Sequence, residues 1–481
     1  MESIRVVKHS EVYDRIVCDP GVAHEISDYF TFDVPGAKFS PAYRNKVWDG
    51  KIRIFNVFHG LLYCGLRTHL EKFAKARQYT IDYDFETADS QFSLKEAEEF
   101  ITDAKFKLTP REHQLMPFVH GVRRGRALFL SPTASGKSFI IYLLTRYYNS
   151  KTLIIVPTVS LVHQMASDFD EYAGYPEDTH KIHAGQTHDT KARIIVTTWQ
   201  SIYKQPSSWF DQFDVVIGDE AHLFKAKSLV SIMSKTDKVR HKFGFTGTLD
   251  GSQCHHLILE GLFGPVKQVV TTAQLIEKKL LAEISIKCIM LSYPDSVRKV
   301  MTKASYQDEI DYLVRNEARN NFIKNLALSL SGNSLLLFQF VDKHGIILRD
   351  LIMAEAKGRP VHYVDGSVDG SDREAIRSIV ETQKNAIIVA SYKTFSTGIN
   401  IKNLHSVILA SPTKSKITNL QSIGRSLRVS DAKTTATLYD ISDDLSWKSK
   451  KNYTYLHFVE RVKIYAAEKF PYKFYKVKID T

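Results

Sequence analysis

The 481-residue sequence has few cysteines, and their arrangement excludes two kinds of site. The four cysteines are scattered, without a C-x-x-C pair, at Cys18, Cys64, Cys254 and Cys288. This spacing argues against a disulfide framework and against a zinc site, and it favours a reducing compartment.

Two further absences concern membranes. No stretch of about 18 uncharged apolar residues occurs, so no membrane span is expected. The first residues, MESIRVVKHSEVYDR, lack the apolar core of a secretory signal. We therefore expect a soluble intracellular protein with no membrane partner.

Positive charge is in excess over the whole chain. Lysine and arginine number 65 against 53 acidic residues, which gives a formal net charge of +12. Such an excess favours solubility and polyanionic partners, and it says nothing about the fold. An ordinary basic surface is an equally good interpretation of the charge alone.

Short apolar runs alternate with helix-like stretches from about Phe106 onward. The first five runs are RALFLS, TLIIVP, RIIVTT, DVVIGDE and KFGFTGT, and the second five are SLLLFQF, PVHYVDG, NAIIVAS, SVILAS and TATLYDIS. Alternation of this kind predicts parallel β-sheets wrapped by helices, and two sets predict two α/β domains. We place these domains at residues 106–282 and 283–446.

Different compositions flank the two sheet domains. Residues 38–77 carry nine Lys/Arg against two acids, with aromatic residues interspersed, inside a predicted small N-terminal α/β domain at 1–82. Residues 83–105 are acidic and are predicted to form a helical connector. Residues 447–481 are basic and aromatic again, and we expect a short helical C-terminal tail.

The segment LFLSPTASGKSFII, residues 128–141, has the pattern of a phosphate-binding loop between a strand and a helix. Such a turn points backbone N–H groups at an anion. Gly136 allows close approach, Lys137 supplies a cation for the β- and γ-phosphates, and Ser138 can bind Mg²⁺. Ser131 stands where a glycine is usual, at little cost because it ends a strand. Three further residues complete the predicted ATP-binding loop: Thr133, Ala134 and Ser135.

A second motif supplies carboxylates. DVVIGDEAHLF is an apolar strand with Asp219 and Glu220 at its C-terminal end, where parallel sheets bind ligands. Phosphoryl transfer needs one carboxylate for Mg²⁺ and a group that orients the attacking water, so we assign Asp219 to the metal and Glu220 to the water. An acidic helix cap is the alternative, but it is less common for D-E-A-H downstream of a phosphate loop.

The second sheet domain supplies guanidinium groups. NLQSIGRSLR contains Gln421, Arg425 and Arg428, and the two arginines share a face if the segment is helical. Planar, permanently charged donors suit the γ-phosphate. We predict Arg428 as an arginine finger with Arg425 assisting, against the alternative of a solvated basic helix face.

These motifs resemble those of the superfamily-2 helicases and translocases over most of residues 106–445. The resemblance implies two tandem RecA-like parallel-sheet domains, with ATP and Mg²⁺ as cofactors and a cleft that closes on ATP and opens after hydrolysis. PREHQ resembles the adenine-reading segment, with Gln114 at the base edge and Arg111 against its face. FTGTL resembles the coupling segment, through Thr246 and Thr248.

Other segments resemble the nucleic-acid contacts of that family. VPTVSLVHQ and TTWQS resemble strand-backbone contacts of the first domain, and YKTFSTGINIKNL resembles a second-domain segment that touches nucleotide and strand. LLFQFVDKHG resembles the first segment of the second domain. The implied residues are Pro157, Thr158, Thr198, Trp199 and Thr397 for the strand, and Gly398 and Asn400 for the nucleotide. Asn400 stands where many relatives carry aspartate.

From end to end, the chain resembles the recombination helicases of T-even bacteriophages, through its N-terminal W-D-G-K-I-R element, its phosphate loop and its basic aromatic tail. That resemblance implies ATP-driven branch migration, fork regression and R-loop unwinding in the cytoplasm of an infected host cell. It implies branched or duplex DNA and RNA–DNA hybrids as substrates, phage recombination and single-strand-binding proteins as partners, and a monomer.

The segment YRNKVWDGKIRIF, residues 43–55, is the predicted DNA contact of the N-terminal domain. Phosphate contacts through Lys46, Lys51 and Arg53 would be salt-dependent, and Tyr43 or Trp48 could stack on unpaired bases. The alternative is that the aromatic residues form a small core and the lysines are merely solvated.

Two other functions stay open at this point. An RNA helicase would carry the same motifs, because D-E-A-H occurs on both kinds of track. A nucleic-acid clamp that uses ATP only as a switch is the non-enzymatic alternative, and the intact Lys137, Glu220 and Arg428 argue against it. No further carboxylate cluster of nuclease type lies outside the sheet domains.

Overall fold

In the computed structural model, the described residues are 2–34, 36–87, 89–132, 135–183, 185–249, 253–368, 370–398, 401, 403–411 and 435–479. The chain divides into two compact units. The first comprises residues 1–131 and 135–270, and the second comprises 132–134 and 271–481. None of the helices formed by the described residues is both long and apolar enough to cross a bilayer.

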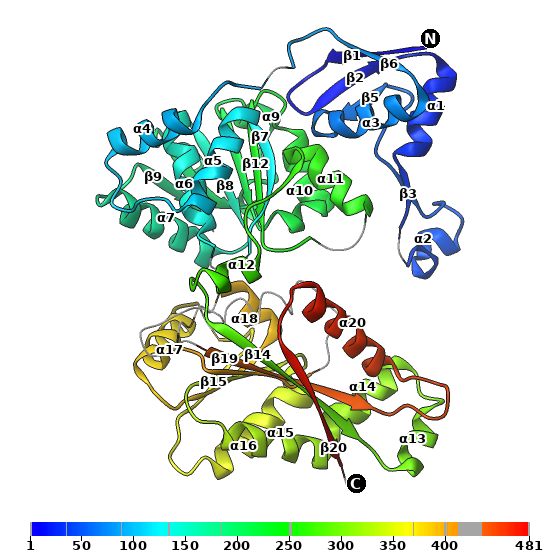
Figure 1. The fold of residues 1–481 in the computed structure, drawn as a ribbon, viewed down its shortest axis with the longest axis vertical. Helices are drawn as coiled ribbons and strands as arrows, with labels where there is room; N and C mark the ends of the chain where they lie inside the picture. Colours follow the sequence, from blue (N-terminus) through cyan, green and yellow to red (C-terminus); the bar gives the residue numbers. More distant parts are fainter. Residues whose placement is uncertain are drawn as a thin grey trace. The chain divides into compact units, whose positions relative to one another are not determined.

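The N-terminal domain is a small α/β layer (Figure 1). Its four-stranded sheet has the order β5–β2–β1–β6, in which β1 is antiparallel to β2 and parallel to β6. The strands are β1 (Ser3–Lys8), β2 (Tyr13–Val17), β5 (Leu61–Tyr63) and β6 (Thr80–Tyr83). Helices α1 (Pro20–Tyr29) and α3 (Arg67–Arg77) bury Ile26 and Leu70 against it. A core that uses one sheet face and two helices fits the alternating burial of β1.

A two-stranded arm extends from this domain. We call residues 31–53 the hairpin arm; β3 (Thr31–Asp33) and β4 (Lys51–Arg53) pair antiparallel at its base. Between them lie a 3₁₀ turn at Ala37–Phe39 and a short helix α2 at Pro41–Arg44. Gly50 has φ +79°, and a Cβ there would lie 3.0 Å from the Tyr43 ring. Glycine is therefore needed for the arm to fold back on itself.

The second half of the predicted acidic connector is helical. Helix α4 (Leu94–Ala104) begins with a capping box in which Ser93 and Glu96 exchange hydrogen bonds with each other's backbone N–H. Ala97 and the preceding Phe92 are buried in the core of the following domain. The connector is thereby packed on the first sheet domain.

The first large sheet has seven strands, all parallel, in the order β13–β7–β12–β11–β8–β10–β9. The strands are β7 (Arg126–Leu130), β8 (Thr152–Val156), β9 (Thr179–Ile182), β10 (Ile194–Thr198), β11 (Val215–Asp219), β12 (His241–Thr246) and β13 (Val266–Gln268). The five predicted strands are the central ones, and β9 and β13 add the two edges. Because all strands are parallel, their carboxyl ends meet at one edge of the sheet.

Helices cover both faces of this sheet (Figure 1). One face packs against α4, α5 (Glu112–Arg124), α6 (Lys137–Tyr148) and α7 (Val159–Ala173). The other packs against α8 (Trp199–Ile202), α9 (Ser207–Phe210), α10 (Lys227–Ser234) and α11 (Gln253–Phe263). Burial from both sides explains why the central strands are continuous apolar runs.

The second large sheet also has seven parallel strands, in the order β16–β17–β15–β18–β19–β14–β20. The strands are β14 (Glu283–Ser292), β15 (Ser334–Phe338), β16 (Val361–Val364), β17 (Ile387–Ser391), β18 (Ser406–Leu409), β19 (Thr435–Asp444) and β20 (Tyr472–Lys478). Its helices include α12 (Thr272–Glu277), α13 (Asp295–Met301), α14 (Tyr306–Arg315), α15 (Glu317–Ser329), α16 (Ile346–Glu355), α17 (Gly370–Thr382) and α18 (Tyr392–Gly398). The predicted fold class, two tandem RecA-like α/β domains after a small α/β domain, is confirmed.

The C-terminal tail differs in detail from the prediction of a helical tail. It contains helix α20 (Tyr453–Ala467), but the chain then forms β20, which pairs in parallel with β14. The sequence YKFYKVK alternates polar and apolar residues only in part, and four consecutive side chains of β20 are exposed. Backbone hydrogen bonding to β14 stabilises this strand, which the side-chain pattern does not predict.

Candidate active site

The phosphate loop lies between β7 and α6. Gly136 caps α6 with φ +82°, a conformation that strains larger residues, and a Cβ there would lie 2.1 Å from the Gln114 Nε2 atom and would displace that side chain. Ser131, which replaces the usual glycine, is fully buried, and its Oγ lies 2.5 Å from the Ser135 Oγ. The substitution therefore adds a hydrogen bond across the base of the loop instead of removing the turn.

Lys137 joins the loop to the carboxylates at the end of β11. Its Nζ lies 3.0 Å from Glu220 Oε1 and 3.5 Å from Asp219 Oδ1. Asp219 ends β11 in the centre of the sheet, and Glu220 follows with φ +49°, a strained left-handed conformation. The sequence-predicted residues Lys137, Asp219 and Glu220 are thus brought within one contact of each other.

Burial and charge act in opposite directions on these three groups. Burial alone lowers the pKa of Lys137, but the two carboxylates outweigh it and raise that pKa above its ordinary value. Burial raises the pKa of Asp219 despite the nearby ammonium group. Burial also opposes the charge of Glu220, yet Lys137 and His222 lower the pKa of Glu220 below its ordinary value. Glu220 is therefore the carboxylate that is held ionised, as a water-orienting group requires.

A chain of polar contacts leads from Glu220 to the coupling segment. The His222 Nδ1 lies 3.4 Å from Glu220 Oε2 and 3.0 Å from Thr246 Oγ1. The Thr246 hydroxyl donates to the Thr248 carbonyl over 2.8 Å, and both threonines are buried. A change in the charge around Glu220 therefore reaches the segment after β12 through two side-chain contacts.

The predicted adenine-reading residues start α5. Gln114 accepts a hydrogen bond from the Arg111 N–H over 2.9 Å and donates to the Ser135 carbonyl over 3.3 Å, so this side chain is anchored to the phosphate loop. The Arg111 side chain is exposed. His113, which the sequence reasoning did not single out, is buried with its Nε2 3.2 Å from the same Ser135 carbonyl. The buried side chains of Gln114 and His113 therefore anchor the phosphate loop through the Ser135 carbonyl.

Ser138 is the predicted hydroxyl ligand of Mg²⁺. Its Oγ lies 2.7 Å from the hydroxyl of Tyr172, near the C-terminal end of α7. Asp219 and Ser138 are hard oxygen donors of the kind that Mg²⁺ prefers, so the donor chemistry fits that ion. No group of three or more His, Cys, Asp and Glu side chains with metal-binding geometry occurs among the described residues. A magnesium ion here would therefore depend on phosphate oxygens as well.

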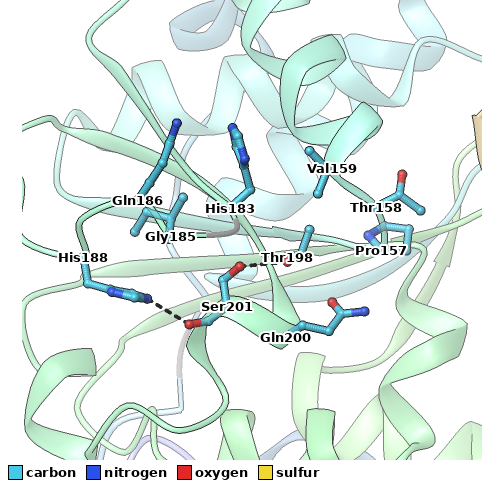
Figure 2. Close-up of a pocket in the computed structure, with 11 residues that line it drawn as sticks. Pro157, Thr158, Val159, His183, Gly185, Gln186, His188, Thr198, Gln200 and Ser201 are labelled. Atoms are coloured by element: carbon cyan, nitrogen blue, oxygen red, sulfur yellow. Dashed lines mark hydrogen bonds between the residues drawn. The ribbon is translucent and has the colours of Figure 1, made fainter. Parts of the chain in front are cut away.

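A pocket of about 610 Å³ lies at the carboxyl ends of β8, β9 and β10 (Figure 2). It brings together Pro157 and Thr158 after β8 with Thr198 at the end of β10, all predicted strand contacts. Thr158 caps α7, and the Thr198 hydroxyl lies 3.0 Å from the Ser201 Oγ. The other lining residues are Val159, Ile182, His183, Gly185, Gln186, His188, Gln200 and Ser201. Trp199 begins α8 beside the pocket and does not line it.

The loop after β9 is a part of this pocket that the sequence reasoning missed. The His183 Nε2 is buried and makes no hydrogen bond within the described structure. The His188 Nε2 lies 2.9 Å from the Ser201 carbonyl, which ties the loop to α8. The only sequence feature that could have indicated this part of the pocket is the cluster of His, Gln and Thr in HAGQTHD, residues 183–189. By itself that cluster predicts only a turn.

The hairpin arm carries the predicted N-terminal DNA contacts. Lys46 and Lys51 are exposed, and neither makes an ion pair with a described residue. Arg53 pairs with Asp49 over 2.6 Å, and the Trp48 Nε1 donates to the Lys51 carbonyl over 2.8 Å. Arg53 and the Trp48 indole N–H thus stabilise the arm itself, while the two lysines face solvent.

Eight predicted residues lie in the last turn of α18 or outside the described part of the chain. Thr397 and Gly398 lie in the last turn of α18, and nothing further is described of their side chains. The following predicted residues lie outside the described part of the chain: Thr133, Ala134, Asn400, Gln421, Arg425 and Arg428. Their roles stay predictions.

Three protein-family models match the chain. The N-terminal model of the DNA helicase UvsW matches residues 3–84, a model described as the type III restriction enzyme res subunit matches 91–251, and the helicase conserved C-terminal domain matches 318–430. The first match coincides with the small α/β domain, the second covers the first large sheet except β13, and the third covers β15 to β18 of the second large sheet.

Relatives of the whole chain agree with these matches. The ATP-dependent DNA helicase uvsW of Enterobacteria phage T4 is 37% identical, over 98% of this chain and 98% of that protein. The DNA 3'-5' translocase XPB2 of Sulfurisphaera tokodaii is 25% identical, over 70% of this chain and 84% of that protein. The crystal structure of T4 UvsW matches with a TM-score of 0.52 and 34% identity, over 99% of both chains. The chain therefore belongs to the UvsW family of DNA helicases, within the superfamily-2 helicases and translocases.

Proposed function

We propose that this protein is an ATP-driven DNA motor that remodels branched DNA, by branch migration, fork regression and R-loop unwinding, in phage recombination, repair and replication. The observation that carries the proposal is the contact of Lys137 with Asp219 and Glu220 at the carboxyl edge of a parallel sheet. Membership of the UvsW family supports DNA as the track.

Each residue of the first-domain site has its own role in ATP hydrolysis. Lys137 leaves the carboxylates for the β- and γ-phosphates when ATP enters, because phosphate oxygens offer it more negative charge. That exchange frees Glu220, held ionised by its surroundings, to orient the attacking water. Ser138 and Asp219 would hold Mg²⁺, which supplies charge neutralisation on the phosphates when bound. Thr246 and Thr248 pass the change at Glu220 on to domain closure.

The second domain completes the site in this proposal. Arg428 stabilises the charge that develops on the γ-phosphate, with Arg425 and Gln421 assisting, and an arginine finger is worth about 10³–10⁵ in rate. Gly398 and Asn400 contact the nucleotide, and Thr133, Ala134 and Ser135 complete its loop. The domain boundaries at residues 82, 105, 282 and 446 belong to the same proposal.

For the DNA track, we assign the pocket lined by Pro157, Thr158 and Thr198 in the first unit, with Trp199 following in the chain. Thr397 is the strand contact that we assign to the second unit. A sugar-phosphate strand fits a site with hydroxyl and backbone N–H donors at a helix N-terminus, such as the start of α7. The hairpin arm adds cations through Lys46 and Lys51. We also propose phage recombination and single-strand-binding proteins as partners, a monomeric state, and action in the cytoplasm of the infected host cell.

The test is ATP turnover measured with single strands, blunt duplex, four-way junctions and R-loops, with single-stranded RNA as a further arm. We expect the greatest stimulation by junctions and R-loops, and no turnover in Lys137→Ala under any of these conditions. Stimulation by RNA alone, or equal stimulation by blunt duplex and junction, would contradict the assignment to branched DNA.

A further inference from the structure

The last strand of the second sheet is an edge strand. β20 pairs with β14 over seven residues, from Ile286 opposite Tyr472 to Ser292 opposite Lys478. On its other side no strand of the described chain pairs with it. Its outer backbone groups therefore have no partner strand among the described residues, and five of its seven side chains are exposed.

One face of β20 combines an aromatic ring with two cations. Because side chains alternate along a strand, Phe474, Lys476 and Lys478 share a face, at spacings of about 6.6 Å. Phe474 is 57% exposed, and both lysines are exposed. We call these three residues the β20 surface.

The exposed Phe474 ring packs against two other aromatic rings. The centroid of Phe474 lies 6.1 Å from that of Phe458 on α20, edge to face, and 5.5 Å from that of Tyr472. These aromatic contacts fix one edge of the ring and leave more than half of the side chain to solvent. A fixed ring loses little conformational entropy when a partner stacks on it.

Lysines on an edge strand have a simpler explanation, which the aromatic residue does not share. Lysine is common on edge strands because its charge discourages pairing with other chains. A half-exposed phenylalanine has the opposite effect, since it adds an adhesive apolar group to the same edge. A binding partner would explain the exposed Phe474 ring, and the neighbouring lysines favour a partner with negative charge.

The charge of β20 is of one sign. The strand contains three lysines and no acidic residue, and none of the three lysines forms an ion pair with a described residue. A cationic strip with an exposed ring fits a chain of phosphates that carries unpaired bases, because the ring takes a base and the ammonium groups take phosphates.

The position of the surface fits the same partner. All seven strands of this sheet are parallel, so the end of β20 at Lys478 lies at the same edge as the ends of β15 and β17. The end of β17 leads into the segment at 392–398, which resembles a family segment that touches nucleotide and strand. Five strand spacings separate β17 from β20, which is roughly 24 Å.

We propose that the β20 surface binds single-stranded nucleic acid next to the motor's track, with one base stacked on Phe474 and adjacent phosphates on Lys476 and Lys478. This inference rests on the proposed function, because it extends the track of that motor. It assigns the basic aromatic tail a second anchoring point on the displaced or translocated strand.

The first experiment measures binding of the full chain to a fluorescent oligothymidylate by anisotropy, across a potassium chloride series. In Phe474→Ala we expect at least about a fivefold weaker affinity, the lower limit for loss of one base–aromatic stack. Phe474→Tyr keeps a ring at the position and should bind like the wild type. ATP turnover without nucleic acid should be unchanged in both variants.

The second experiment concerns the lysines. In Lys476→Gln with Lys478→Gln, the slope of log affinity against log salt should fall by about 1.4, or about 0.7 for each single-strand phosphate contact. The matched control is Tyr475→Ala with Lys473→Gln, which removes an exposed ring and a lysine from the other face of the same strand. Affinity and salt slope should stay near wild type there.

Three outcomes would overturn the inference. They are wild-type affinity in Phe474→Ala, an equal loss in the opposite-face control, and an equal loss on blunt duplex, which has no unpaired base to stack. Loss on oligouridylate similar to that on oligothymidylate supports it, since stacking tolerates either sugar. Failure of the proposed function is distinguishable: the wild type would then bind single strands without any nucleic-acid-stimulated ATP turnover.

Discussion

Glu220 is the residue whose geometry defines its expected role most narrowly. Its carboxylate lies 3.0 Å from the Lys137 ammonium and 3.4 Å from the His222 ring, and its backbone is held in a left-handed conformation. In Glu220→Gln we expect ATP to bind with near wild-type affinity, because the phosphate-loop donors remain. Turnover should fall by about 10²–10⁴, the usual contribution of a general base.

Binding and turnover have to be measured separately to test this role of Glu220. A fluorescent ATP analogue gives the affinity, and single-turnover hydrolysis with junction DNA gives the chemical step. Asp219→Asn is the comparison, since a metal-holding carboxylate should affect magnesium-dependent binding as well. Loss of nucleotide binding in Glu220→Gln would contradict the division of roles between the two acids.

Tyr172 is a positioning residue that no sequence motif indicates. A serine hydroxyl has one proton to donate and two lone pairs, so Ser138 can donate to Tyr172 while a lone pair remains for the metal. In Tyr172→Phe the magnesium concentration at half-saturation of ATP-analogue binding should rise by about fivefold, as expected for one lost hydrogen bond near 1 kcal/mol. A magnesium titration of nucleotide binding measures this without turnover.

The control for Tyr172 is Tyr175→Phe. The Tyr175 hydroxyl accepts from the Arg146 guanidinium over 2.7 Å, two residues beyond α7, and it does not contact Ser138. Its removal should leave the magnesium titration unchanged. If both variants shift alike, the effect comes from the packing of α7 and not from the hydroxyl at Ser138.

At the scale of elements, the hairpin arm is the predicted contact for duplex or junction DNA. Double charge reversal, Lys46→Glu with Lys51→Glu, should weaken junction binding and lower its salt slope by about 0.9 for each lost duplex phosphate contact. Basal ATP turnover should not change, because the arm is remote in the sequence from every residue of the phosphate loop. Anisotropy with a labelled four-way junction across a salt series provides the measurement.

Arg53 is a poor choice for charge reversal in the hairpin arm. Arg53 holds Asp49 at the base of the arm, so its reversal would disturb the fold as well as the charge. Lys95→Glu on α4 is a better control, since its side chain is 85% exposed and lies outside the arm. The arm variant changes the net charge by −4 and the α4 variant by −2, so half as much weakening in the α4 variant would mean that net charge alone governs binding.

Elements with strong periodicity could be predicted from the sequence, and those held by backbone pairing could not. The five central strands of the first large sheet are apolar runs because helices bury both their faces, so composition alone reveals them. β9, with only THKI, and β20, with YKFYKVK, gain their conformation from a neighbouring strand. The helical prediction for the tail was therefore right for α20 and wrong for β20.

The candidate site shows the same division. Lys137, Ser138, Asp219 and Glu220 could be predicted because phosphate chemistry fixes their spacing within two short segments. The contacts of Tyr172 and His113 with those segments could not, because each depends on how one helix packs against another. The spacing of residues in the sequence does not predict how two helices pack against each other.

At the scale of the whole molecule, the N-terminal domain and the first large sheet belong to one compact unit. The Glu11 carbonyl accepts hydrogen bonds from Arg126 over 2.7 Å and from Lys242 over 2.8 Å. At Gly65 a Cβ would lie 2.0 Å from the Glu260 carbonyl oxygen, so the two domains touch backbone to backbone. The hairpin arm is thus carried by the first motor domain.

Lys242 is the buried centre of this junction. Its Nζ donates to the carbonyls of Glu11, Thr236 and Val239 at 2.8–2.9 Å, which uses all three ammonium protons. In the sequence it is an ordinary lysine beside an apolar strand, and nothing there reveals the partner 231 residues away. In Lys242→Met the side-chain volume is kept but the carbonyls lose a donor, so the free energy of unfolding should fall by about 2–4 kcal/mol.

Urea unfolding gives that free energy, and hydrogen exchange locates its origin. In Lys242→Met we expect faster exchange in β1 and β2 around Glu11, since opening of the junction no longer breaks three hydrogen bonds. Lys235→Met is the matched control: its Nζ also donates to two carbonyls, but at a half-buried position that water can reach, so the loss should stay below about 1 kcal/mol. Wild-type exchange around Glu11 in Lys242→Met would mean that the apolar contacts between the two domains hold the junction without the lysine.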